Sequence, residues 1–127
     1  MTQNKLYLEA ESYRIRGAIF EVYREKGCGF HEAVYQECLE KEFKLADIPF
    51  QSQPEVKLSY KGQPLDQTYR PDFIGFGEII IELKALSKTA PEHEAQVINY
   101  LKATGFKVGF LVNFGAHPKA KIQRIVR

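Results

Sequence analysis

The chain has 127 residues, of which 44% are hydrophobic and 27% charged, a composition typical of one globular domain with a single core over residues 1–127. Lys and Arg number 18 against 16 acidic residues, so there is no global basic charge for nucleic acid and any such contact needs a local patch. No apolar run approaches the ~20 residues that cross a bilayer, and no signal peptide is recognisable, so we expect a cytoplasmic protein without membrane contact.

Two helices are predicted at the start of the chain. Apolar residues in segment 5–26 recur at the i, i+3, i+4, i+7 spacing of a helix with one buried stripe. The glycines of "GCGF" (27–30) predict its end. A second helix is predicted over 31–46, where Tyr35 and its apolar neighbours form one face, and Asp47 and Pro49 end it.

The hydrophobic period then changes to two, which predicts strands. A third helix is expected to begin at Pro91, a favoured first helical position, and to end at Gly105. The strands are expected at 55–60, 65–74, 78–86 and 106–115, with a short edge strand at 121–126. The order α-α-β-β-β-α-β, with or without a last β, predicts an α/β fold: three meandering strands and a helix crossover give a mixed four- to five-stranded sheet flanked by helices.

Charged residues interrupt the most apolar of these strands, "GEIIIELKAL" (77–86). Side chains alternate along a strand, so Glu82 and Lys84 share one face. If Gly77 is the centre of a hairpin turn, residues equally far from it lie opposite each other, and Asp72 faces Glu82 with their Cβ atoms ~5 Å apart. The simplest pairing therefore gathers two carboxylates and one amine on a single face.

Two adjacent carboxylates repel each other, and a divalent cation such as Mg²⁺ removes the conflict. The bound ion can activate water, and Lys84 can orient that water or neutralise a phosphoryl transition state. The pattern D-x9-E-x-K thus suits metal-dependent phosphodiester hydrolysis. The alternative is a cross-strand salt bridge on a solvated sheet face, although the strand is apolar on both faces.

A second motif lies upstream, in "GFHEAVY" (29–35), where Gly29, Glu32 and Tyr35 have the spacing G-x-x-E-x-x-Y. Together with "RPD" and "ELK", it resembles the GxxExxY protein family, a branch of the PD-(D/E)xK nuclease superfamily. The resemblance covers most of the chain, because "GCGFHEAVYQECLEKEF", "YRPDF", "IIIELKAL", "HEAQVINYLKATG" and "VGFLVNFG" follow in the family's order. Several short motifs in the right order make the resemblance specific.

The resemblance implies a restriction-endonuclease-like core and a Mg²⁺- or Mn²⁺-dependent nuclease, and we expect DNA rather than RNA as its substrate. It implies that Asp72 and Glu82 bind the metal, with the carbonyl of Leu83 as a further candidate ligand, and that Glu32 completes the shell directly or through water. Lys84 would position the water or the phosphate, and Gln96 would support the site. The small surface for DNA suggests a homodimer or a larger partner.

Two other functions stay open at this point. One is a non-catalytic module that binds nucleic acid or protein on the same fold, and the other is a phosphodiesterase acting on a small nucleotide. Tyr35 is expected to pack rather than to catalyse. His31 and His93 lack the i, i+4 spacing of a metal pair and are expected at the surface or at helix caps. Cys28 and Cys38 are expected to be free thiols.

Overall fold

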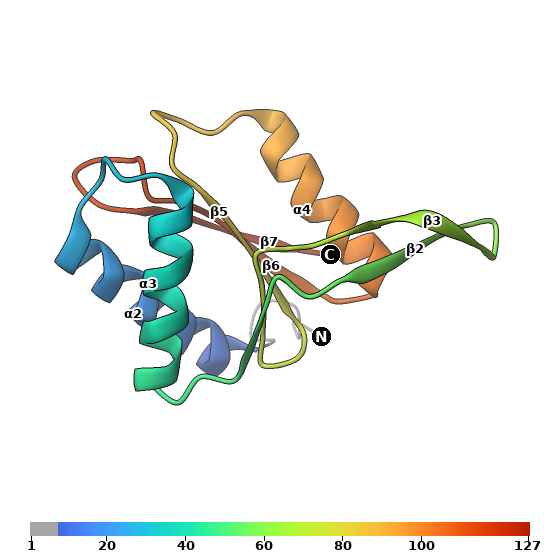
Figure 1. Ribbon diagram of the computed structural model, residues 1–127, viewed down its shortest axis with the longest axis horizontal. Helices are drawn as coiled ribbons and strands as arrows, with labels where there is room; N and C mark the ends of the chain where they lie inside the picture. Colours follow the sequence, from blue (N-terminus) through green and yellow to red (C-terminus); the bar gives the residue numbers. More distant parts are fainter. Residues whose placement is uncertain (1–7) are drawn as a thin grey trace.

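A computed structural model of the chain describes residues 8–127 (Figure 1). Its helices are α2 (Glu9–Lys26), α3 (Glu32–Leu45) and α4 (Pro91–Thr104). Its strands are β1 (Phe50–Ser52), β2 (Val56–Tyr60), β3 (Gln63–Tyr69), β4 (Phe73–Gly75), β5 (Ile79–Lys84), β6 (Val108–Asn113) and β7 (Lys121–Val126). Five strands form one sheet in the order β1-β4-β5-β6-β7, and β2 and β3 form a separate two-stranded ribbon.

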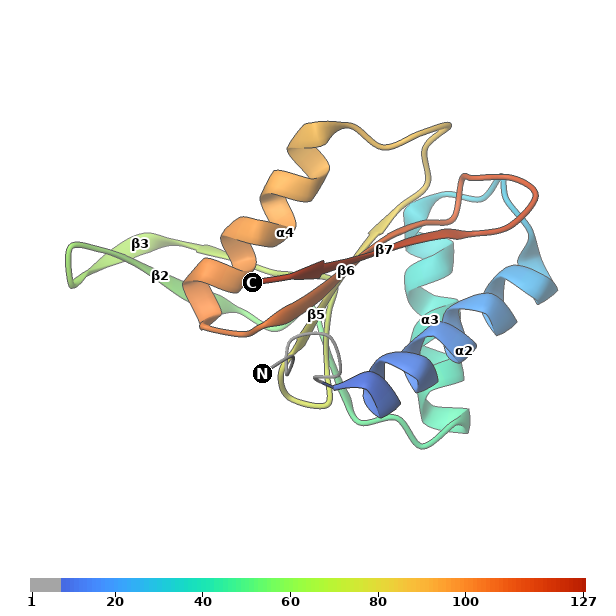
Figure 2. The same cartoon turned by 180° about the vertical axis from the view of Figure 1, so that it is seen from behind.

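The main sheet is mixed, because β5 and β6 pair in parallel and the other neighbours pair antiparallel. The parallel pair requires a crossover, which α4 supplies between β5 and β6. Helices α2 and α3 cover one face of the sheet and α4 covers the other (Figures 1 and 2). This arrangement confirms the predicted α/β class and the mixed sheet flanked by helices.

Alternation along β5 divides the core between these two faces. Ile79, Ile81 and Leu83 point into the larger core with α2 and α3, whereas Ile80 points into the smaller core with α4. Being apolar on both faces is typical of a central strand covered on both sides. Glu82 therefore lies on the α4 side of the sheet, one step beyond a fully buried isoleucine.

The hairpin between β4 and β5 has the predicted register. Phe73 pairs with Ile81 and Gly75 with Ile79, which places the turn at Phe76 and Gly77. Both turn residues have positive φ, 52° and 74°, as a type I′ hairpin turn requires. The ladder ends at Phe73 and Ile81, and one step beyond it the N–H of Asp72 donates to the side-chain carboxylate of Glu82 at 2.8 Å.

The expected strand over 65–74 is wrong as a single element. Residues 63–69 belong to the ribbon, and the chain enters the main sheet only at Phe73. Pro71 lies at the break because it has no N–H for a ladder hydrogen bond. The strand predicted at 55–60 likewise lies in the ribbon, so the three-stranded meander does not exist.

Strand β1 was not predicted, since it has three residues and no clear alternation. It pairs with β4 at the edge of the sheet. The other expected elements are confirmed with bounds shifted by up to two residues, apart from residues 5–7 of the first helix, which lie outside the described part. The edge strand 121–126 has the predicted bounds.

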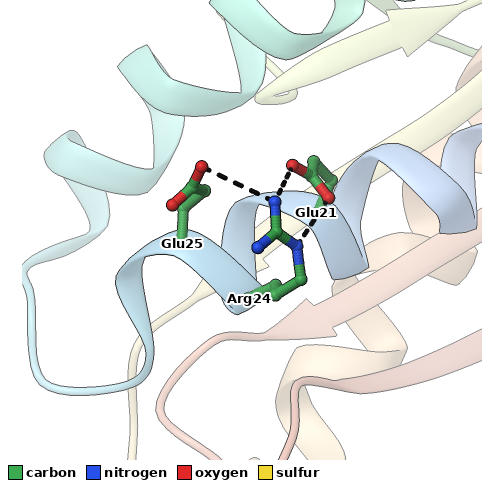
Figure 3. A network of polar contacts seen from close by, with 3 residues as sticks. All are labelled: Glu21, Arg24 and Glu25. Carbon is green, nitrogen blue, oxygen red and sulfur yellow. Dashed lines mark hydrogen bonds and ion pairs between the residues drawn. The ribbon is translucent and has the colours of Figure 1, made fainter.

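The surface of α2 carries a small ion network, in which Arg24 contacts Glu21 at 2.6 Å and Glu25 at 3.6 Å (Figure 3). The hydrogen bond from Arg24 lowers the pKa of Glu21. Arg24 and Glu25 are exposed and Glu21 is partly exposed, so solvent screens these pairs and they contribute little to stability. None of the helices in residues 8–127 is long and apolar enough to span a bilayer.

Candidate active site

Asp72 and Glu82 hold their carboxyl groups against each other's backbone. The N–H of Asp72 donates to Oε1 of Glu82 at 2.8 Å, and the N–H of Leu83 donates to Oδ2 of Asp72 at 2.7 Å. Each carboxyl group thus uses one oxygen to fix its own position. Oδ1 of Asp72 and Oε2 of Glu82 receive no hydrogen bond from the described residues.

Burial makes the charged forms of these two carboxyl groups unfavourable. Glu82 is only 5% exposed, and burial followed by the negative charge of Asp72 raises its pKa to about 8. The pKa of Asp72 is also raised, chiefly by burial and further by the charge of Glu32. Two acids with raised pKa values are therefore side by side at the end of the β4–β5 hairpin, where a cation would relieve their repulsion.

Lys84 follows on the same strand and is half-buried. Its charge lowers the pKa of both Asp72 and Glu82, although less than burial raises them. Within residues 8–127 it forms no ion pair with either carboxylate. The alternative of a cross-strand salt bridge on a solvated face is therefore wrong, since Glu82 is buried and forms no ion pair with the amine of Lys84.

A groove of about 630 Å³ opens beside Asp72, between α3 and the sheet. Glu32, from the first turn of α3, lines this groove together with Asp72 and Leu83. Glu32 is exposed, and its charge acts on both Asp72 and Glu82. The structure therefore brings the upstream motif to the hairpin, although Glu82 does not line the groove itself.

Gln36, which the sequence did not single out, connects α3 to the site. Its side-chain amide donates to the carbonyl oxygen of Asp72 at 3.2 Å and to Oγ of Ser52 at 3.0 Å. Ser52 in turn donates to Glu40. The available signal was the polar stripe of Glu32, Gln36 and Glu40 at i, i+4, i+8, which shares one face of the helix.

Gln96 on α4 is linked to the site by a pair of stacked tyrosines. Its amide donates to the hydroxyl oxygen of Tyr100 at 2.7 Å, and the Tyr100 ring stacks on Tyr69 with centroids 4.1 Å apart. Burial is the first cause that raises the pKa of both tyrosines to about 12, and the negative charge of Glu82 is a smaller cause for each. The two tyrosines therefore border the site.

Tyr35 packs, as expected. It is fully buried, stacks on Phe114 with centroids 4.4 Å apart, and donates from its hydroxyl to the carbonyl of Gly27 at 2.6 Å. This bond ties the loop before α3 to the helix that carries Glu32. His93 accepts a hydrogen bond from the Ala90 N–H at 2.9 Å and so caps α4, which confirms the cap prediction. Both cysteines are free thiols.

The donor set fits a hard divalent cation only in part. Asp72 and Glu82 offer the free carboxylate oxygens that Mg²⁺ or Mn²⁺ binds, and one or two protein carboxylates with several waters are common for such ions. Within residues 8–127, however, no group of three or more His, Cys, Asp and Glu side chains is arranged to hold a metal. Glu32 lines the groove beside Asp72.

Comparison with known proteins identifies the superfamily of the chain. The family model of the PD-(D/E)XK nuclease superfamily matches residues 9–125. The chain therefore belongs to the PD-(D/E)XK nuclease superfamily. Nucleases of this superfamily act on nucleic acid and generally depend on a divalent metal.

One solved structure that the chain resembles is the crystal structure of SSO0001, with a TM-score of 0.58 and 19% sequence identity. The match covers 75% of this chain and 50% of that one, so this chain spans about half the length of that structure. At this identity the likeness shows a shared fold. A search of curated proteins found no significant match.

Proposed function

We propose that this protein is a nuclease of the GxxExxY type that hydrolyses phosphodiester bonds in DNA with Mg²⁺ or Mn²⁺. The observation that carries the proposal is the buried pair of Asp72 and Glu82, whose free oxygens and raised pKa values suit a cation. Membership of the superfamily supports the same chemistry. Residues 1–127 would form one nuclease-like domain.

Each residue has a role in this proposal. Asp72 and Glu82 hold the ion, and Glu32 reaches it through water from the rim of the groove. When bound, the ion lowers the pKa of a bound water and neutralises charge on a phosphoryl oxygen. Lys84 is free of ion pairs with the two acids, so its amine can orient the attacking water or contact the scissile phosphate. Gln96 supports the site through Tyr100.

The test combines metal binding with cleavage. Calorimetric titration with Mn²⁺ is expected to show binding to the wild type and none to Asp72→Ala. Lys84→Ala is expected to keep the fold and to lower kcat on labelled DNA by roughly 100-fold or more, as loss of a charge-stabilising group does. Lys88→Ala, which removes an exposed lysine beyond the strand, is the matched control and should cleave normally.

Other results would favour the alternatives. Metal-independent retention of DNA without cleavage by the wild type would indicate a binding module. Cleavage of dinucleotides but not of polymers would indicate a small-nucleotide phosphodiesterase. Full activity of Lys84→Ala would remove the lysine from the mechanism.

A further inference from the structure

The β2–β3 ribbon projects from the body of the protein beyond α4 (Figures 1 and 2). Residues 59–68 are all exposed. The ribbon joins the body at its base, where Val56 packs against the smaller core and Tyr69 stacks on Tyr100. A two-stranded ribbon is marginally stable alone, so this base holds it in place. We call residues 55–70 the arm.

The arm is joined directly to the candidate active site. Its second strand ends at Tyr69, and Asp72 follows three residues later. A polymer with a phosphate at Asp72 therefore passes the base of the arm. The seven residues of β3 span ~23 Å at ~3.3 Å per residue, which is the length of about seven base pairs.

Charge distinguishes the two sides of the site. On the α3 side, the groove is lined by Glu32, Glu37 and Glu40 with Lys41 as the one basic residue among its lining residues. A polyanion is repelled from that side.

The arm side carries more positive charge. Lys57 and Lys61 are exposed, and Arg70 lies at the base, 3.6 Å from Glu55. Asp66 is the other acid of the arm, so the arm carries a net positive charge. A nucleic acid bound at Asp72 is thus directed along the arm rather than along α3.

The side chains of the arm suit base edges as well as phosphates. Gln63, Gln67 and Thr68 are exposed hydrogen-bonding groups, and Leu65 is 42% exposed. Glutamine can bond adenine and an apolar side chain can contact the thymine methyl group in the major groove. At the tip, Tyr60 is 63% exposed, beside the amine of Lys61.

We infer that the arm lies in the major groove of duplex DNA whose backbone is bound at Asp72. The groove of B-DNA admits a two-stranded ribbon, whereas the major groove of A-form RNA is too narrow. The inference rests on the proposed nuclease function for the position of the backbone, and it deepens that function by naming duplex DNA as the substrate form. A dinucleotide substrate would leave the arm without a role.

The test measures binding without cleavage. Fluorescence anisotropy with a labelled 20-base-pair DNA duplex in EDTA compares the wild type with the double variant Lys57→Gln/Lys61→Gln. Affinity is expected to fall by about tenfold or more at low salt, and the slope of log K against log salt to fall by up to about two, one for each lost phosphate contact. Lys26→Gln/Lys44→Gln makes the same charge change on exposed residues of α2 and α3, on the opposite side from the arm, and should bind like the wild type.

Three outcomes would overturn the inference. They are an unchanged affinity of the arm variant, equal losses in the arm and control variants, and wild-type binding to duplex RNA that is as tight as to duplex DNA. Sedimentation that shows a wild-type dimer and a monomeric arm variant would assign the arm to a second copy of the chain instead. The binding test does not depend on cleavage. If the arm variant loses affinity as expected while the wild type fails to cleave DNA in the separate cleavage assay, the proposed nuclease activity is rejected and the arm remains a DNA-binding element.

Discussion

The acids of the site are held in place by backbone donors rather than by basic side chains. Glu82 bonds the N–H of Asp72, and Asp72 bonds the N–H of Leu83. Fixed acids in a buried position retain their mutual repulsion, because neither can turn toward solvent. At the scale of single residues, the site is therefore destabilising until a proton or a cation neutralises it.

This repulsion predicts a pH dependence of stability in metal-free protein. The pKa of Glu82 rises from an ordinary value of 4.5 to about 8 on folding, so the folded state keeps this proton up to a higher pH than the unfolded state does. The contribution of Glu82 to the free energy of unfolding is therefore greatest below about pH 4.5, and the free energy of unfolding should fall by about 2–4 kcal/mol as the pH rises to about 8. Urea denaturation in EDTA across this range measures it.

Glu82→Gln should flatten that pH dependence because the amide does not titrate. Glu92→Gln, which changes an exposed acid on α4, should keep it. A slope that persists in Glu82→Gln would assign the effect to other groups.

Gln36 allows a second prediction at this scale, because it holds the carbonyl of Asp72 from the helix that carries Glu32. Gln36→Leu removes both donated bonds and should weaken Mn²⁺ binding by about 10-fold, the lower range for supporting residues of metal sites. Calorimetric titration measures the affinity. Glu37→Gln, on the neighbouring position of α3, is the control, and equal Mn²⁺ affinity in Gln36→Leu and the wild type would contradict the role.

At the scale of elements, a polar clamp fixes the end of β5 just after Lys84. The buried side chain of Asn113 accepts from the N–H of Leu86 at 3.0 Å and donates to its carbonyl at 2.9 Å. It also accepts from the N–H of Gly115 at 3.0 Å. The clamp joins the ends of the two parallel strands and so holds the loop that leaves the site.

Gly115 is required for this clamp, because a Cβ there would meet the backbone of Leu86. Gly115→Ala should lower the free energy of unfolding by about 1–3 kcal/mol, the usual cost of overpacking. Gly17→Ala is the control, since a Cβ on this exposed helical position meets nothing within 4 Å and should stabilise by about 0.5–1 kcal/mol. Chemical denaturation measures both, and an unaffected Gly115→Ala protein would show that the loop can move away.

At the scale of the whole molecule, the acids lie where several parts meet. The hairpin stands between the two cores, α3 borders it on one side, and the arm and α4 border it on the other. An ion bound to Asp72 and Glu82 would therefore stabilise the folded state as a whole. It cannot bind equally well to the unfolded chain, in which the two acids are not held together.

Added Mn²⁺ should thus raise the thermal unfolding midpoint. At 100 times its Kd the stabilisation is about 2.7 kcal/mol, which corresponds to roughly 5–10 °C for a chain of this size. Circular dichroism melts in EDTA and in Mn²⁺ measure the shift. Asp72→Asn should lose it, and Asp66→Asn, which changes an exposed acid of the arm, should retain it. An equal shift in both variants would place the ion elsewhere.

Local chemistry in the sequence determined the hairpin and its register, because a turn with glycine at its centre sets which residues lie opposite. It also determined the helices and the motifs that indicate a nuclease. These features depend on residues close together in the chain, so their patterns can be read directly.

Only the tertiary structure decided which strands share a sheet. It divided the segment 65–74 between the arm and β4 and paired the short β1 with β4. It also brought Gln36 on α3 to the carbonyl of Asp72 and Glu32 to the groove that Asp72 lines. Strand pairing between distant segments and the packing of a helix on a sheet are set by the total burial of apolar surface. No local pattern contains that information, and for this reason the arm became visible only once the chain was folded.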